Sequence, residues 1–515
     1  MMRFARYRNQ VPFIGLCLAI LWPIGSTAAT PIVGGEVSRF IPIQPCPFPS
    51  SGNVAPERLH CGYLEAPMDR QHPEAGKVRL PVAIIRSRII PSQPDPVVFI
   101  AGGPGAAPVA SARTLEKFAA HRFGENRDII LFSQRGSLGT TPELRCDRLR
   151  DQRQLVYLED HDLKQRDRAI RRVATDCLRQ LRNQGLPPGV WSSAAIARDL
   201  RDLRQSLGLS SWNLLAVSYG TLIAQEVARV DAKGVRSMVL DSLVSPESDL
   251  FMSEAAENFS AGIERVLQAC AKDTTCQARF PQLRDSLDRV LERLREHPLK
   301  LVIDGGGDTA LDMVVNWHDF LGLTHWMLYS ATTLDWIPVL IDETDQGRFG
   351  LLQHLLSRVF PAPALAEDAA AGAFFAVVCR DQYRPALLPG AEDDHFGGYA
   401  LTSFMGSVCA APGLDYGDFP LVAPLVSDVP TLLLSGNFDL ITPPRYASRV
   451  LEGLSRGVLA QVPNYGHSTL SGYTACQTDV AAAFFNHPES PLDMTCLEAL
   501  PPPQFTTDAG VILAP

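Results

Sequence analysis

The stretch Trp212-Asn-Leu-Leu-Ala-Val-Ser-Tyr-Gly-Thr221 runs directly into Leu222-Ile-Ala-Gln-Glu-Val-Ala-Arg229. The first part is rich in apolar residues, as in a strand buried on both faces, and the second has the apolar spacing of a helix. Ser218 lies between them, with Ala216 and Gly220 two residues to either side. Small residues at these positions suit the tight turn of a G-x-S-x-G motif. The stretch therefore predicts a strand, a sharp turn that exposes the serine hydroxyl, and a helix; the alternative is a buried serine in an ordinary strand-to-helix turn.

The composition is that of a globular protein. The 515 residues are 46% hydrophobic and 20% charged, and the length allows one large domain with a second domain or a large insertion. The net charge of −9 and the lack of a basic face interleaved with aromatic residues argue against nucleic-acid binding. Arginines gather between residues 145 and 182, but acidic residues are mixed among them, which indicates a solvated helix surface.

The N-terminus has the pattern of an export signal. Three arginines precede residue 10, an apolar run follows over residues 11–25, and small residues stand at 27–29. The apolar run is too short to span a bilayer comfortably. We predict a signal peptide over residues 1–29, a periplasmic or secreted location, and no membrane span in the mature chain.

The cysteines fit an oxidising compartment. One of the eleven, Cys17, lies in the predicted signal peptide, which leaves an even number of ten. Zinc is the rival explanation, but the sequence contains neither C-x-x-C nor H-E-x-x-H, so we expect no metal and no cofactor. The order of the cysteines suggests that neighbours pair, as Cys46–Cys61, Cys146–Cys177, Cys270–Cys276, Cys379–Cys409 and Cys476–Cys496.

Apolar runs with the length of strands alternate with helical patterns through much of the chain. A pair of opening strands is expected over 61–69 and 78–85, after an irregular proline-rich segment at 30–51. Further strands are expected over 96–100, within 127–136 where a strand leads into a turn, from 212 to the turn at Ser218, and over 235–242, 429–436 and 457–463. Such alternation predicts a mostly parallel sheet flanked by helices.

A largely helical region interrupts this alternation. We predict an α/β core formed by residues 30–245 and 428–515, and a mainly helical cap formed by residues 246–427. Within the cap, the turn-rich segment Asp304-Gly-Gly-Gly-Asp308 favours a hairpin loop over a calcium site.

Two polar residues near the C-terminus complete a candidate catalytic triad with Ser218. A serine hydroxyl needs a base to take its proton, and that base needs an acid to hold one tautomer. Asp439 and His467 each follow an expected strand, in the order acid then histidine that a nucleophile elbow requires. Taken singly, Asp439 could be a turn residue and His467 an ordinary histidine. Asp241, also at a strand end, is the rival acid.

The anion that forms on an attacked carbonyl needs two placed N–H donors. The backbone of Tyr219, directly after the serine, offers one. The glycine turn after the 96–100 strand offers the other, from Gly103 or, as an alternative, Gly102. A plain turn is the alternative explanation; a phosphate loop is disfavoured because no Gly-Lys-Ser/Thr follows.

Several of these motifs together resemble the proline iminopeptidase and tripeptidyl aminopeptidase family of α/β-hydrolases. The motifs are Ala101-Gly-Gly-Pro-Gly105, Ser133-Gln-Arg-Gly136, Ala216-Val-Ser-Tyr-Gly-Thr221, Gly436-Asn-Phe-Asp439 with Thr442-Pro443, and Gly466-His467. The C-terminal part resembles the TAP-like region of secreted bacterial members. The resemblance implies an α/β-hydrolase fold with a helical cap, and a serine exopeptidase acting on free N-termini.

The sequence departs from the family pattern at three places. Ala101 stands where the family has His, Ser133 where it has Asp, and Ala216 where it has Gly. None of these is a member of the triad, so hydrolysis remains the prediction, while a preference for proline is in doubt. Acidic cap residues bind the substrate amine in the family; Glu254, Glu257 and Glu264 are available here, but an exposed helix face explains them equally well, and none is assigned.

The sequence therefore predicts an exported serine hydrolase, an aminopeptidase that releases residues or short peptides through an acyl-enzyme. One alternative is a carboxylesterase or lipase with the same triad. The other is a hydrolase-fold binding protein without catalysis. The expected partner is a peptide or small ester substrate, and the oligomeric state is not predicted.

Overall fold

The structure is a computed structural model. It describes residues 38–49, 54–146, 159–249, 251–252, 254–305, 310–330, 332–359, 370–383, 396, 399–414, 416, 423–470 and 475–513. The predicted signal peptide lies outside these ranges. Among the helices within them, none has the length and apolar character needed to cross a membrane.

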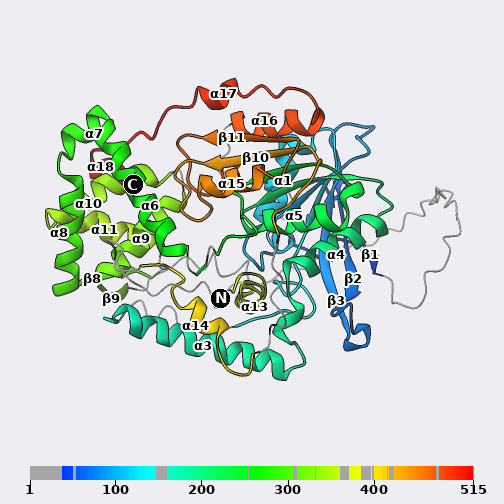
Figure 1. The fold of residues 1–515 in the computed structure, drawn as a ribbon, viewed down its shortest axis with the longest axis horizontal. Helices are drawn as coiled ribbons and strands as arrows, with labels where there is room; N and C mark the ends of the chain where they lie inside the picture. Colours follow the sequence, from blue (N-terminus) through cyan, green and yellow to red (C-terminus); the bar gives the residue numbers. More distant parts are fainter. Residues whose placement is uncertain are drawn as a thin grey trace, which may run out of the picture. The chain divides into compact units, whose positions relative to one another are not determined.

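Nine strands of the described residues form one sheet, in the order β1–β2–β3–β5–β4–β6–β7–β10–β11. Their bounds are β1 Arg39–Ile43, β2 Leu59–Pro67, β3 Lys77–Ile85, β4 Val97–Ile100, β5 Ile129–Phe132, β6 Trp212–Val217, β7 Val235–Asp241, β10 Thr431–Gly436 and β11 Gly457–Val462. Figure 1 shows β10 and β11 on one side of the sheet and β1, β2 and β3 on the other. Strands β1, β2, β3 and β5 pair antiparallel, whereas every pair from β5 to β11 is parallel. The predicted mostly parallel sheet and its opening antiparallel pair are confirmed.

The expectation of an irregular segment over residues 30–51 was wrong for part of its length. Strand β1 pairs with β2 within this segment, and Pro42 lies opposite Gly62. A proline lacks the N–H that a central strand needs on both sides, but it is tolerated in an edge strand. The proline-rich composition concealed a strand because β1 lies at the edge of the sheet.

Helices cover both faces of the sheet. Successive residues of β6 point to opposite faces, so Leu214 and Ala216 enter one hydrophobic core and Leu215 enters the other. The first core is covered by α3 (Leu163–Asn183), α4 (Ser193–Ser206), α5 (Tyr219–Val230), α13 (Ala371–Gln382), α14 (Met405–Cys409) and α15 (Pro444–Leu451). The second core is covered by α1 (Ala112–Ala120), α16 (Ala475–Asn486) and α17 (Thr495–Glu498).

Most residues of a third hydrophobic cluster come from the segment between β7 and β10. It is built from α6 (Ala255–Lys272), α7 (Thr274–Arg279), α8 (Leu283–Glu296), α9 (Trp317–Tyr329), α10 (Ile337–Asp345) and α11 (Gly350–Val359) (Figure 1). Strands β8 (Leu299–Asp304) and β9 (Ala310–Val315) pair antiparallel beside these helices, which confirms the predicted hairpin. The turn residues 306–309 lie outside the described ranges.

The hydrophobic clusters do not coincide with the core and cap regions predicted from the sequence. Helices α13 and α14 belong to the region predicted as cap, yet they pack in the same core as α3. Conversely, Ile512 of α18 (Ala509–Leu513) packs in the third cluster, with helices α6 to α11.

Five disulfides join the ten cysteines that follow the predicted signal peptide, with the neighbouring pairs that the sequence suggested. Each bridge closes a loop of 6 to 31 residues. Disulfides persist in oxidising compartments, so these bridges are consistent with the predicted export.

Candidate active site

Ser218 lies at the sharp turn between β6 and α5. Its backbone has φ 57° and ψ −132°, a left-handed conformation that is strained for a residue with a side chain. The Ser218 N–H donates to the Asp241 carbonyl at 2.9 Å, and both the N–H and the hydroxyl of Thr221 donate to the Ser218 carbonyl. These hydrogen bonds hold the strained turn.

The small residues on either side of Ser218 are there for steric reasons. A Cβ on Gly220 would lie 2.2 Å from the carbonyl oxygen of Ile100, so only glycine fits. Ala216 is completely buried in the core beneath the turn. The structure therefore accommodates Ala where the G-x-S-x-G pattern has its first Gly.

Asp439 and His467 form a buried hydrogen-bonded pair. The distance from His467 Nδ1 to Asp439 Oδ2 is 2.9 Å, and both side chains are at most 1% exposed. Three further donors reach the Asp439 carboxylate: the backbone N–H groups of Ile441 and Thr442, and the Thr442 hydroxyl. The pair therefore fixes Nδ1 as the protonated nitrogen and leaves Nε2 to act as a base.

Burial alone would raise the pKa of Asp439. The charge of His467 and the hydrogen bonds from His467 and Thr442 overcome this effect and hold the pKa of the Asp439 carboxyl below its usual value. Asp439 is thus a carboxylate that can orient an imidazole and stabilise its charged form.

The hydrogen bond between His467 and Ser218 is not formed in this structure. His467 Nε2 is buried and has no hydrogen-bond partner among the described residues. In enzymes without substrate, the hydrogen bond between nucleophile and base is often long and tightens only in the complex.

Asp241, the rival acid, connects the serine turn to the histidine loop. Its backbone carbonyl accepts the Ser218 N–H, as described above. Its buried carboxylate accepts hydrogen bonds from the N–H and hydroxyl of Thr469 and from the N–H of Leu470. Asp439 therefore contacts the imidazole of His467, whereas Asp241 holds the segment that follows it.

The glycine turn after β4 lies against Ser218. A Cβ on Gly102 would lie 2.9 Å from the Ser218 Cβ, so a side chain there would collide with the serine. Gly103 has φ 110°, a conformation that L side chains rarely adopt. On the other side, Tyr219 is the first residue of α5, and the N–H groups of a first helical turn have no intrahelical acceptor.

Gln134 holds this glycine turn, a role that the sequence analysis missed. Its side-chain NH₂ donates to the carbonyls of Ala101 and Gly102 at 2.7 and 3.0 Å, and its oxygen accepts the Gly105 N–H at 2.8 Å. The Ser133-Gln-Arg-Gly136 motif contained the signal. Of this motif, only Ser133 was singled out from the sequence, as a departure from the family pattern, and its side chain is fully buried.

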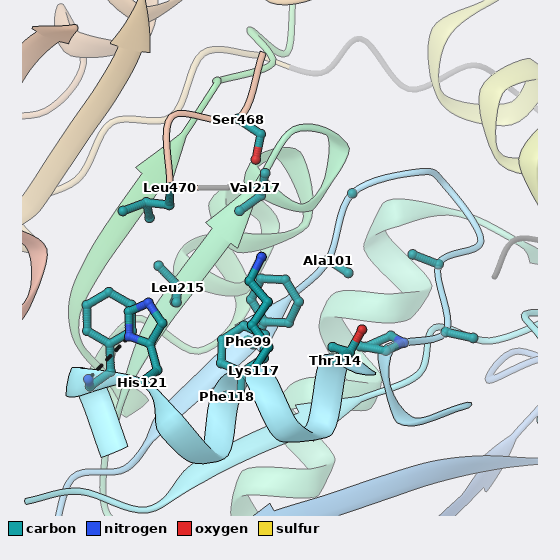
Figure 2. A pocket seen from close by; sticks show the side chains of 15 residues that line it. Phe99, Ala101, Thr114, Lys117, Phe118, His121, Leu215, Val217, Ser468 and Leu470 are labelled. Carbon is teal, nitrogen blue, oxygen red and sulfur yellow. Dashed lines mark hydrogen bonds between the residues drawn. The ribbon is translucent and has the colours of Figure 1, made fainter. Parts of the chain in front are cut away.

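A pocket of about 250 Å³ adjoins the same turn (Figure 2). Val217 and Ser468, which precede Ser218 and follow His467, line its upper part, and Phe99 and Phe118 are among the aromatic residues that line it. Ser218 and His467 themselves are not among its lining residues. The pocket is therefore a neighbour of the candidate site and does not contain it.

Burial lowers the pKa of two basic side chains of this pocket. Burial, with the neighbouring charge of Arg113, lowers the pKa of the Lys117 amine to about 8. Burial, with the charge of Lys117, lowers the pKa of His121 to about 4. The His121 ring accepts a hydrogen bond from the Phe123 N–H (Figure 2).

The tyrosine that follows Ser218 is anchored through a chain of hydrogen bonds. The Tyr219 hydroxyl lies 2.8 Å from Ser193 Oγ, and the hydroxyl and N–H of Ser193 both donate to the Asp381 carboxylate on α13. Burial raises the pKa of Asp381 to about 6, although the Ser193 donors oppose the shift.

The three acidic residues singled out in the region predicted as cap have basic partners. Glu254 accepts a hydrogen bond from the Tyr446 hydroxyl and forms ion pairs with Arg445 and Arg449. Glu257 forms an ion pair with Arg445 at 3.3 Å, and Glu264 forms one with Arg284. In the ranges that the structure describes, no group of three or more His, Cys, Asp and Glu side chains could hold a metal ion.

Two family models match the chain. The α/β hydrolase fold model matches residues 95–300, and the model of the TAP-like protein matches residues 394–496. The two matches together span more than half of the 515 residues. The first match includes the turn at Ser218, and the second includes Asp439 and His467.

Curated relatives match over less than half of their length. The serine protease Hip1 of Mycobacterium tuberculosis is 26% identical over 240 residues, which cover 45% of this chain and 45% of that protein. The tripeptidyl aminopeptidase of Streptomyces lividans is 28% identical over 211 residues, which cover 39% and 38% of the two chains.

Among solved structures, a proline iminopeptidase from Mycobacterium smegmatis is 14% identical, with a TM-score of 0.38 over 80% of this chain and 95% of that one. This TM-score adds nothing to the fold assignment, which rests on the sheet and on the family models.

We predict that Asp381 makes stability depend on pH. Because its folded pKa of about 6 lies above the unfolded value of about 3.9, the unfolded chain releases this proton first as the pH rises. Relative to Asp381→Asn, the protein should lose about 2 kcal/mol of unfolding free energy between pH 4 and pH 7. Urea unfolding of both proteins across this range measures the difference, and parallel curves would contradict it.

Proposed function

Because this chain belongs to the α/β-hydrolase fold family and carries a TAP-like region, we propose that it is a serine hydrolase that cleaves peptides from a free N-terminus through an acyl-enzyme. The observation that carries the proposal is the buried Asp439–His467 pair, with Nε2 left for a nucleophile that stands at a strained turn. The relatives named as a serine protease and as a tripeptidyl aminopeptidase favour a peptide substrate.

The first half of the proposed reaction forms the acyl-enzyme. Ser218 Oγ attacks the scissile carbonyl carbon while His467 Nε2 takes the hydroxyl proton. The negative charge that develops on the carbonyl oxygen is stabilised by the N–H groups of Tyr219 and Gly103. His467 then gives its proton to the leaving amine, the C–N bond breaks, and the ester with Ser218 remains.

The second half releases the product. A water molecule gives a proton to His467 Nε2 and attacks the ester carbonyl, and the C–O bond to Ser218 breaks as the proton returns to the serine oxygen. Asp439 stays ionised throughout and stabilises the imidazolium. The charge-assisted hydrogen bonds on its carboxylate support this role.

We propose that the protein acts outside the cytoplasm. The five disulfides support export, since such bridges are rare in the cytosol. The positive, apolar and small-residue segments at the N-terminus support it as well.

Digestion of a peptide library tests the substrate class. The proposal expects cleavage near free N-termini and loss of cleavage when the same peptides are acetylated, with products read by mass spectrometry. Cleavage of short acyl esters alone, with acetylation irrelevant, would replace the peptidase by a carboxylesterase or lipase. Failure of Ser218 to react with a fluorophosphonate probe would favour the alternative of a hydrolase-fold binding protein without catalysis.

Substitutions of the triad should lower kcat far more than they change KM. Ser218→Ala removes the nucleophile and should lower kcat by about 10⁶, and Asp439→Asn should lower it by about 10⁴ because the imidazole takes the wrong tautomer. Steady-state kinetics on a peptide anilide measure both. Asp241→Asn serves as the comparison for the acid: a larger loss there than in Asp439→Asn would reverse the assignment.

Gln134→Leu should lower kcat by about 100-fold, because the turn that carries Gly103 loses all three of its side-chain hydrogen bonds. Gln134→Glu keeps the acceptor for Gly105 but places a carboxylate oxygen against the carbonyls of Ala101 and Gly102, so it should also lose activity. Gln180→Leu, an exposed glutamine of α3, is the matched control and should keep the activity of the natural protein. Equal kcat in Gln134→Leu and the control would contradict a role in catalysis.

A further inference from the structure

Two helices of the region between β7 and β10 contact the backbone of the candidate acid and base. The carbonyl of Tyr329, the last residue of α9, accepts the His467 N–H at 3.1 Å. Arg265 of α6 donates from Nη2 to the carbonyl of Asp439 at 3.0 Å. These contacts reach the acid and the base from the cap helices.

Gly466 and His467 both lie close to the C-terminal end of α9. A Cβ on Gly466 would lie 2.2 Å from the Leu328 carbonyl oxygen, so glycine is required for the approach. The rings of Tyr329 and His467 lie 4.7 Å apart between centroids. The last carbonyls of a helix lack intrahelical donors, and the His467 N–H satisfies one of them.

Helix α6 also packs closely, on the segment that follows Asp439. A Cβ on Gly262, one turn before Arg265, would lie 3.0 Å from the Leu440 Cβ, so the helix packs directly on the segment that follows Asp439. Burial lowers the pKa of Arg265, and the negative charge of Asp439 opposes this effect. The guanidinium is therefore held near the carboxylate in a partly desolvated place, where its charge acts more strongly than in water.

The segment that follows His467 is also hydrogen-bonded to the end of strand β7. The Ser468 N–H donates to the Ser242 hydroxyl at 2.7 Å, beside the bonds from Thr469 and Leu470 to Asp241 described above. His467 thus has its own N–H bonded to α9 and the next three N–H groups bonded to residues at the end of β7.

We propose that Arg265 and the C-terminal end of α9 position the Asp439–His467 pair, so that helices of the region predicted as cap form part of the catalytic frame. The inference rests on the proposed function. It implies that α6 and α9 stay docked on the acid and base loops during turnover, and that substrate enters past other elements.

Arg265 variants test the inference with a readout beyond loss of activity. Arg265→Met keeps the length of the side chain but removes the donor and the positive charge. It should lower kcat 10- to 100-fold with KM within about twofold, because a small misplacement of the pair is costly. Arg265→Lys keeps the charge and a donor and should recover most of the loss.

The pH profile separates positioning by a charged donor from simple packing. Arg265→Met removes a positive charge that interacts with Asp439, so the acid limb of kcat/KM should move to higher pH than in the natural protein. In Arg265→Lys it should stay in place. The other titratable groups around this pair are common to both variants: Asp241 and His325 interact with His467, and Tyr329 interacts with Asp439. Arg445 interacts with Arg265 itself.

Gly466→Ala tests the α9 contact separately. The added methyl group would overlap the Leu328 carbonyl, push the helix end from the loop and lower kcat in the same range. Arg284→Met is the control, since Arg284 belongs to the same cap and pairs with Glu264 on the surface. Thermal unfolding confirms that each variant is folded.

Unchanged kcat and pH profile in folded Arg265→Met and Gly466→Ala would overturn the inference, as would a loss in Arg265→Met that lysine does not recover. The proposed function fails by a different result, namely full activity of Ser218→Ala. The two failures are therefore distinguishable in one set of measurements.

Discussion

The hydrogen bond between His467 Nδ1 and Asp439 is the interaction on which the rest of the site depends. A carboxylate without exposure to water is costly unless its oxygens are bonded. Here the chain supplies three donors besides the imidazole, two from the backbone directly after Asp439 and one from the Thr442 hydroxyl. The local turn thus makes a buried charge tolerable, and the charge in turn orients His467.

A second constraint is the strained backbone of Ser218. Its conformation persists because Asp241 and Thr221 bond its N–H and carbonyl, while Gly220 lets the helix approach the end of β4. Asp241 also bonds the loop after His467. One buried aspartate therefore couples the position of the serine to that of the histidine, although it touches neither side chain's reactive atom.

Much of this could be predicted from local patterns. The alternation of apolar runs indicated the mostly parallel sheet, the spacing of small residues around Ser218 indicated the sharp turn, and the order of the cysteines indicated the five bridges. Strand β1 was not predicted because proline usually indicates the absence of a strand, whereas an edge strand tolerates it. The motif around Gln134 was recognised, but its role was missed because the turn that it holds lies 29 to 33 residues earlier in the chain.

By itself the sequence determined the types of element, the turn at Ser218 and the set of polar residues that follow strand ends, since period, propensity and steric fit act between near neighbours. Only the tertiary structure decided how these residues divide the work: Asp439 bonds the imidazole, Asp241 bonds the following loop, and Arg265 bonds the Asp439 carbonyl from 174 residues away. Hydrogen bonds over such separations leave no periodic trace in the chain, because they depend on how helices and strands pack and not on the residues beside them.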